Sequence, residues 1–247
     1  MASISGHCIN TVRVIPISKV RGTTCRRRNG LGIIAVWRIA RLKRSHYCEI
    51  PENGSMAMFD LYNKRINCKI VYYGTGLGGK TTNLKYIYSQ LSPSTRGEII
   101  CLQTETERTL FFDFMSLDLG TVKGFSTHFS LYTVPGQAEY NASRRLILNG
   151  ADGIIFVADS DALRSGENRE SMENMMDNLS EYGLTLDQVP WVLQYNKRDL
   201  STAMSLDRME RECNTQKVPS FEAIAADGRG VFATLKAVVK EVLNRFQ

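Results

Sequence analysis

The stretch "YYGTGLGGKTT", Tyr72 to Thr82, places four glycines and one lysine between an apolar run and a helix-forming run. Glycine destabilises the interior of a helix or strand by about 0.5 to 1 kcal/mol. A cluster of glycines at this point therefore indicates a backbone that turns through positive φ or lies close against a ligand. The lysine indicates that this ligand is an anion.

Within this stretch, "GTGLGGKT" matches the phosphate-loop pattern G-x-x-x-x-G-K-S/T, directly after a predicted strand and directly before a predicted helix. Successive main-chain N–H groups and the helix N-terminus hold a phosphate in such a loop. We expect Lys80 to bridge the β- and γ-phosphates of a nucleoside triphosphate and Thr81 to bind Mg²⁺. The predicted phosphate-binding residues are Gly74, Thr75, Gly76, Leu77, Gly78, Gly79, Lys80, Thr81 and Thr82.

A second motif, "NKRD" from Asn196 to Asp199, follows the predicted strand "WVLQYN" and selects the base. The Asp199 carboxylate can accept two hydrogen bonds from the N1 and N2 donors of guanine, with Lys197 lying along the base. Adenine has no such donor pair and would leave Asp199 unpaired, and sites of this kind discriminate by about 10⁴. The pattern therefore predicts GTP and GDP as ligands, with Asn196, Lys197 and Asp199 at the base.

The rest of the chain alternates strand-like and helix-like segments, which is typical of a mostly parallel sheet with helices on both faces. The fold class is therefore α/β. The run "GIIFVADS" is apolar on consecutive residues, as expected for a strand buried on both faces. The predicted strands are Ile66 to Tyr73, Gly97 to Gln103, Phe129 to Val134, Gly153 to Ser160, Trp191 to Asn196 and Ser220 to Ala226.

Two smaller patterns concern the core. Met172, Met175, Met176 and Leu179 recur at helical spacing, and we expect them to pack against the sheet. Cys68 lies within an apolar strand pattern and is expected to be a buried side chain rather than a reactive thiol. The six cysteines and three histidines show neither zinc-ligand spacing nor a disulfide framework.

Charge separates a basic leader, residues 1–55, from a predicted domain, residues 56–247. The leader has 10 Lys and Arg against 2 Asp and Glu, so the net charge of +6 divides into +8 for the leader and −2 for the domain. The basic pI therefore comes from the leader, and it indicates no nucleic-acid-binding surface on the domain. The apolar stretch of the leader, Leu31 to Trp37, is too short to span a bilayer. It is interpreted as sequence upstream of a start at Met56 or Met58; a disordered tail and a basic amphipathic surface anchor are the alternatives.

Four segments together resemble the MglA-type gliding-motility GTPases, a bacterial branch of the Ras-like small GTPases, over residues 57 to 246. These segments are "INCKIVYYGTGLGGKTTNLKYIY", "TETERTLFFDF", "LYTVPGQAEYNASRRLILNGADGIIFVADS" and "QYNKRDL". The resemblance implies a six-stranded Ras-like sheet with an added N-terminal strand, which "MFDLYN" would supply. It also implies GTP or GDP with Mg²⁺ as cofactors.

The third motif departs from the usual D-x-x-G of Ras-like proteins, because Thr133 stands where the aspartate is expected. That carboxylate usually supports Mg²⁺ through water, so the change puts the strength of metal binding in question. MglA-type proteins share this threonine. By resemblance, the Gly136 N–H senses the γ-phosphate and Gln137 orients the attacking water.

The resemblance assigns further roles in "TETERTLFF" and "AIAADG". Thr109 would bind Mg²⁺ and the γ-phosphate, and Arg108 would be an internal arginine finger, a role that accelerates phosphoryl transfer by about 10³ to 10⁵ in related enzymes. A solvated ion pair with Glu105 or Glu107 is an equal alternative for Arg108 from chemistry alone. The Ala225 N–H would meet the guanine carbonyl.

These residues predict a GTP-hydrolysing molecular switch that is slow without an activating partner. The resemblance implies that this partner is a roadblock-fold dimer of the MglB type and that the biology is cell polarity with gliding or pilus-driven motility. The expected location is the cytoplasm, with recruitment to a cell pole or the inner membrane surface through partners. Two alternatives remain: a nucleotide-dependent scaffold with little hydrolysis, and a P-loop kinase, which N-K-x-D disfavours.

Overall fold

The structure is a computed structural model that describes residues 47–48, 58–102, 112–137 and 140–246. All of them lie within the unit formed by residues 44–247. Among these residues, no helix is both long and apolar enough to cross a membrane.

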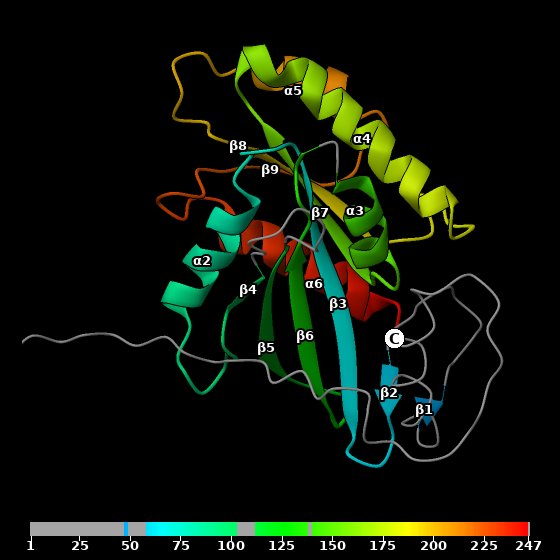
Figure 1. Cartoon of the computed structure of the whole chain (residues 1–247). Coiled ribbons are helices and arrows are strands. Elements are labelled where there is room, and N and C mark those ends of the chain that lie inside the picture. The colour runs from blue at the N-terminus through cyan, green and yellow to red at the C-terminus, as the bar shows by residue number, and fades with distance from the viewer. Residues whose placement is uncertain (1–46, 49–57, 103–111, 138–139, 247) are drawn as a thin grey trace, which may run out of the picture. The chain divides into compact units, whose positions relative to one another are not determined.

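A single sheet organises the described chain (Figure 1). Its main path runs β4-β5-β6-β3-β7-β8-β9, and β2 pairs with both β1 and β3. Strands β6, β3, β7, β8 and β9 are parallel, whereas β1, β2, β4 and β5 pair antiparallel. The strands are β1 Tyr47–Cys48, β2 Met58–Asp60, β3 Arg65–Gly74, β4 Ile100–Leu102, β5 Phe112–Val122, β6 Phe125–Thr133, β7 Gly153–Asp159, β8 Trp191–Asn196 and β9 Ser220–Glu222.

Helices cover both faces of this sheet and create two cores. The first core lies between the sheet and helices α2 and α6, and the second lies between the sheet and helices α3, α4 and α5. The helices are α2 Lys80–Gln90, α3 Asn141–Leu148, α4 Ser165–Ser180, α5 Leu206–Cys213 and α6 Val231–Asn244. A short 3₁₀ turn, η4 (Ala162–Arg164), precedes α4.

Successive side chains of each central strand point alternately into these two cores, as the two-residue period of a strand requires. On β3, Ile70 and Tyr72 belong to the first core, whereas Val71 and Tyr73 belong to the second. All seven residues of β7 are buried. The consecutive apolar run seen in the sequence is therefore a strand covered on both faces, as predicted.

The prediction missed β5 and overextended β4. The segment expected as a strand from Gly97 to Gln103 contains β4 over only three residues. Strand β5 contains two aspartates and a glycine, residues that are depleted in strands. It joins β6 through Lys123 and Gly124, whose φ angles of 50° and 80° are those of a two-residue hairpin turn. The added N-terminal strand is confirmed as β2.

The core expectations are confirmed with one exception. Cys68 is buried, and burial raises the pKa of its thiol well above the usual range, so the group is an unreactive thiol. On α4, Met175 and Leu179 are buried and Met172 packs against the second core. The prediction that Met176 packs against the sheet was wrong, because this side chain is 40% exposed.

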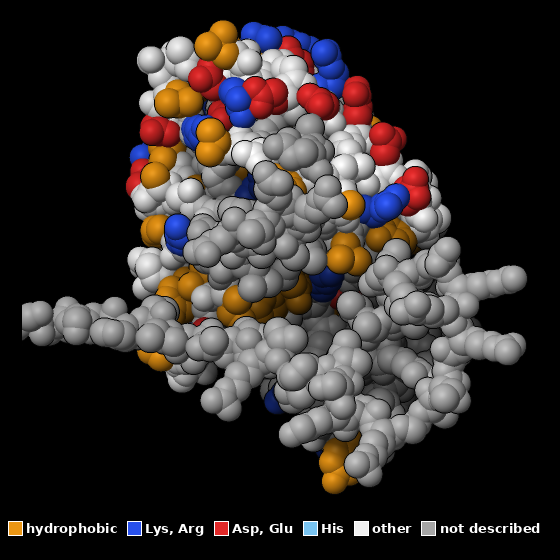
Figure 2. Space-filling view, viewed as in Figure 1, with side chains coloured by type: hydrophobic (Ala, Val, Ile, Leu, Met, Phe, Trp, Pro, Cys, Tyr) orange, Lys and Arg blue, Asp and Glu red, His pale blue; other side chains and the backbone are white. Residues whose placement is uncertain are grey.

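Acidic and basic side chains lie intermixed over α4 and α5 on the face shown in Figure 2. Helix α4 carries a contact of this kind, since Glu167 in its first turn pairs with Arg164 of η4 at 2.5 Å. This surface has no single sign of charge, in keeping with the small net charge of residues 56–247.

The close packing of α6 on β7 gives a test of the fold. A Cβ at Gly153 would lie 2.8 Å from Val242 Cγ2 and 2.9 Å from Val238 Cγ2. Gly153→Ala should therefore lower the free energy of unfolding by about 1 to 3 kcal/mol, measured by chemical denaturation. Gly166→Ala is the control, because no atom lies within 4 Å of its Cβ position. In a helix this change should stabilise by up to about 1 kcal/mol, and equal effects at the two sites would contradict the packing.

Candidate functional site

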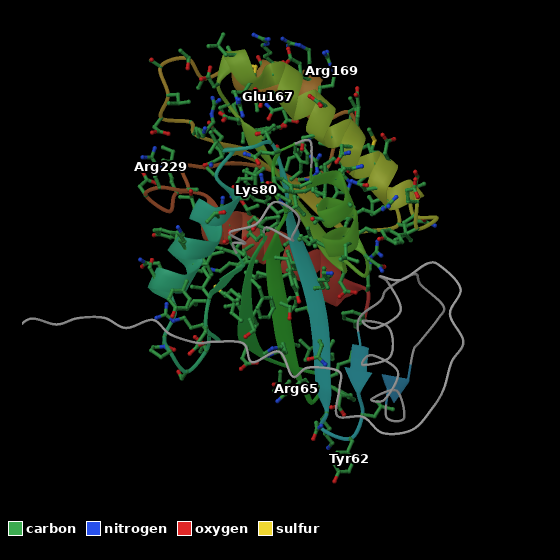
Figure 3. The ribbon with its side chains drawn as sticks, in the orientation of Figure 1. Tyr62, Arg65, Lys80, Glu167, Arg169 and Arg229 are labelled. Carbon is green, nitrogen blue, oxygen red and sulfur yellow. The ribbon has the colours of Figure 1, made fainter. Side chains whose placement is uncertain are left out.

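The carboxyl ends of four parallel strands meet at one edge of the sheet. Gly74 of β3 pairs with Val157 of β7, and Asp159 of β7 pairs directly with Asn196 of β8. This edge is where open α/β sheets bind ligands. Figure 3 shows Lys80 and Glu167 at this end of the sheet and Arg65 at the other. The phosphate-loop and base motifs are therefore brought together, although Gly74 and Asn196 lie 122 positions apart in the sequence.

Lys80 holds the beginning of the phosphate loop, residues 74–81. Its Nζ donates to the carbonyl of Gly74 at 2.9 Å and to that of Thr75 at 2.5 Å. The side chain is 6% exposed, and this burial lowers the pKa of the ammonium to about 7. The nearby Arg144 lowers the pKa further, and Asp113 acts in the opposite direction. An anion beside Lys80 would restore the charge that burial disfavours.

Side chains from other elements hold the remainder of the loop. Arg164 Nη2, from η4, donates to Gly76 O at 2.7 Å, and Asn196 Nδ2 donates to Gly78 O at 2.8 Å. Donors on η4 and β8 thus bind carbonyl groups of the loop. The first four N–H groups of a helix have no intrahelical acceptor. Together these features direct main-chain donors of the loop and of α2 to an anion.

Two glycines close the site because no other residue fits. Gly79 has φ 101°, and a Cβ there would lie 2.1 Å from Asn196 Nδ2. A Cβ at Gly136 would lie 2.2 Å from the Cα of Gly76. The main chain after β6 therefore lies directly against the phosphate loop, at the point where the sequence predicts a γ-phosphate sensor.

Asp113 of β5 is the main residue that the sequence reasoning missed. Thr81 Oγ1 donates to Asp113 Oδ2 at 2.5 Å, and Thr133 Oγ1 donates to the same oxygen at 3.0 Å. The Asp113 N–H in turn donates to Thr133 Oγ1 at 2.9 Å. Thr133 thus replaces the expected aspartate but holds another carboxylate beside Thr81. No alternation marks Asp113 in "FDFMSL", because Phe114 and Met115 are both apolar, and its place soon after "TETERTLFF" was the available signal.

The base motif is built around an ion pair with a buried carboxylate. Lys197 Nζ lies 2.6 Å from Asp159 Oδ2, and Asp159 is fully buried. Lys197 has φ 64°, a left-handed conformation that costs a non-glycine residue about 1 to 2 kcal/mol. Strain of this kind is typical of functional sites. Asp159, which the sequence reasoning also missed, therefore fixes the direction of Lys197.

Asn196 connects the base motif to the loop around Ala225. Its Oδ1 accepts from the Ala225 N–H at 2.8 Å. In this structure the donor expected to meet the guanine carbonyl therefore has a protein acceptor, and its role toward the base stays a prediction. Asp199 is exposed, as a group that recognises a base from solution must be.

Other predicted residues lie at the rim or outside the described chain. Leu77 and Thr82 are exposed beside the loop, and Leu77 has φ 58°. Gln137 is exposed directly after Gly136. Arg108 and Thr109 lie outside the described residues.

Comparison with known proteins agrees with this geometry. The model of the ADP-ribosylation factor family matches residues 55–243. The mutual gliding-motility protein MglA of Myxococcus xanthus (strain DK1622) is 53% identical over 192 residues, which cover 78% of this chain and 98% of that protein. The chain belongs to the MglA-type small GTPases. Residues 1–54 lie outside the family match.

As an MglA-type GTPase, the chain binds guanine nucleotide and hydrolyses GTP. Its Ras-like fold is the one predicted from the sequence. Three segments of this GTPase follow the carboxyl ends of parallel strands. They are the phosphate loop after β3, the Gly136 turn after β6 and the N-K-x-D turn after β8.

Proposed function

We propose that this GTPase is a molecular switch that regulates cell polarity and gliding or pilus-driven motility. The observation that carries the proposal is the meeting of the phosphate loop, Gly136 and the N-K-x-D turn at one edge of the sheet. Similarity to a protein named for gliding motility supports the biological setting.

In this proposal, Lys80 binds the β- and γ-phosphates. The ammonium already lies inside the loop, bound to the Gly74 and Thr75 carbonyls, so little reorganisation is needed when an anion arrives. The N–H groups of residues 76–82 surround the phosphates. Gly79 holds its φ of 101° without the steric cost that a side chain would add.

The proposed metal is Mg²⁺, which favours hard oxygen ligands. Thr81 fits this role because its hydroxyl gives its hydrogen to Asp113 and keeps its lone pairs available. Asp113 supplies a nearby carboxylate in place of the missing aspartate at position 133. Thr109 is proposed as a further ligand by resemblance. When bound, the ion neutralises charge on the β- and γ-oxygens.

The proposed guanine site consists of Asn196, Lys197, Asp199 and Ala225. Asp199 accepts the N1 and N2 donors, and Lys197 lies along the base with its ammonium held by Asp159. Asn196 joins the phosphate loop to the Ala225 loop through its two amide atoms. Because Asp199 would lose both hydrogen bonds with adenine, ATP should compete poorly with GTP.

For hydrolysis, Gln137 is proposed to orient the attacking water and Gly136 to sense the γ-phosphate. The proposal is supported by the position of Gln137, which is exposed and directly follows the turn that lies against Gly76. Arg108 is proposed as an arginine finger that would neutralise the charge that spreads onto the leaving-group oxygen of GDP and onto the equatorial oxygens of the γ-phosphate.

A roadblock-fold, MglB-type activating protein is the proposed partner, and motility or polarity effectors are proposed to bind the GTP form. We propose a cytoplasmic location with recruitment to a cell pole or the inner membrane surface through such partners. The scaffold alternative, with little hydrolysis, is not favoured by the family. Its main argument was the missing aspartate, and Asp113 offers a carboxylate within hydrogen-bond distance of Thr133, which stands at that position.

The metal proposal predicts that Asp113→Asn weakens Mg²⁺ binding by about 10- to 100-fold, as the loss of a supporting carboxylate does in other metal sites. The measurement is the dissociation rate of a fluorescent GDP analogue as a function of free Mg²⁺. Asp118→Asn is the control, because Asp118 lies on the same strand but pairs with His128. An unchanged Mg²⁺ midpoint for Asp113→Asn would remove this carboxylate from the metal site.

The hydrolysis proposal predicts that Gln137→Leu retains GTP but slows single-turnover hydrolysis at least about tenfold. Arg108→Ala should lower the partner-stimulated rate by about the same factor or more. Matched controls are Gln90→Leu and Arg169→Ala, both exposed residues on helices α2 and α4. Wild-type rates for the two site variants, measured as phosphate release, would show that neither residue takes part.

A further inference from the structure

Strand β8 carries a polar side chain into the first core. Val192 of β8 belongs to the core shared with α2 and α6, whereas Leu193 and Tyr195 belong to the opposite core. Alternation therefore directs Gln194 and Asn196 to the side of α2 and α6. Asn196 reaches the phosphate loop, as described above. Gln194 lies deeper along the same strand and is fully buried.

Gln194 forms a reciprocal amide pair with Asn83 of α2. Asn83 Nδ2 donates to Gln194 Oε1 at 2.8 Å, and Gln194 Nε2 donates to Asn83 Oδ1 at 3.0 Å. Both residues are 0% exposed and lie 111 positions apart in the sequence. Two antiparallel hydrogen bonds between planar amides fix both the separation and the relative orientation of α2 and β8 at this point. Apolar contacts at the same place would not impose this directional constraint.

Each end of this pair continues to a further element. Asn83 Nδ2 also donates to the carbonyl of Gly79, the last loop residue before α2, at 2.9 Å. Gln194 Nε2 donates to Thr234 Oγ1 of α6 at 3.1 Å, and Thr234 donates to Gly230 O at 2.8 Å. The chain of hydrogen bonds therefore runs from the end of the phosphate loop through β8 to the start of α6.

The position of the pair relates it to nucleotide binding. Asn83 follows Lys80 by three residues, and Gln194 precedes Asn196 by two. One member thus belongs to the element that holds the phosphates and the other to the element that holds the base. A bound nucleotide spans both elements, so its affinity depends on their separation.

We propose that Asn83 and Gln194 are positioning residues that fix the phosphate loop relative to the guanine-binding strand, and so slow the release of GDP. The proposal rests on the guanine-nucleotide site described under Proposed function. Burial of two uncharged amides in an apolar core costs free energy unless both are fully hydrogen-bonded. The four hydrogen bonds of Asn83 and Gln194 meet this cost, and the pairing gives a direction that apolar side chains lack.

The test separates positioning from stability by using shape-matched apolar replacements. Asn83→Leu and Gln194→Met each leave one amide buried without its partner, so each should lower the unfolding midpoint in urea. The double variant removes both amides and should recover most of that loss. All three variants, loaded with a fluorescent GDP analogue, should release it at least about tenfold faster than the wild type.

Asn214→Leu is the matched control. Asn214 is a buried asparagine at the end of α5 whose amide bonds to Glu210 and to the main chain of Val218. This change should lower the unfolding midpoint without changing the release rate.

A double variant that is as stable as the wild type and releases GDP within twofold of its rate would overturn the proposal. In that case the pair serves stability alone. Failure of the wild type itself to bind GDP would instead overturn the proposed nucleotide site. The two failures are therefore distinguishable within one set of measurements.

Discussion

The site depends on a buried ammonium held by main-chain carbonyls. Lys80 Nζ binds the Gly74 and Thr75 carbonyls, and burial lowers its pKa to about 7. An ammonium in such surroundings is more stable with an anion beside it. Arg164 and Asn196 bind carbonyls farther along the loop, so the donors of the loop remain directed to that anion. The glycines noticed first in the sequence allow this backbone path.

In the proposed site, one edge of the sheet would read both ends of a nucleotide. Asn196 joins the phosphate loop to the Ala225 loop, and Asp159 fixes the direction of the Lys197 side chain. The amide pair of Asn83 and Gln194 lies beneath these contacts, inside the core. Polar groups that are buried and fully paired specify geometry more sharply than apolar packing, which fits their place between the two halves of the site.

Motifs formed by residues that are neighbours in the sequence could be predicted, whereas contacts between strands that are far apart in the sequence could not. The loop around Lys80 was predicted because its glycine spacing has a direct physical cause. Strand β5 was missed because its aspartates and glycine disfavour a strand locally, and pairing with β6 overrides that preference. Asp113 and Gln194 follow from register and facing, which depend on which strands become neighbours. Met176 was misplaced because helical spacing alone does not set the width of the buried stripe.

The most direct test of the buried ammonium is calorimetric titration of GDP into the nucleotide-free protein at pH 8, in two buffers with different ionisation enthalpies. With a pKa of about 7, Lys80 is mostly neutral at this pH, and a neighbouring phosphate raises that pKa. Phosphate groups with a second pKa of about 6 are already ionised. The account predicts binding with uptake of about one proton. The absence of binding, or a heat that is independent of the buffer, would contradict it.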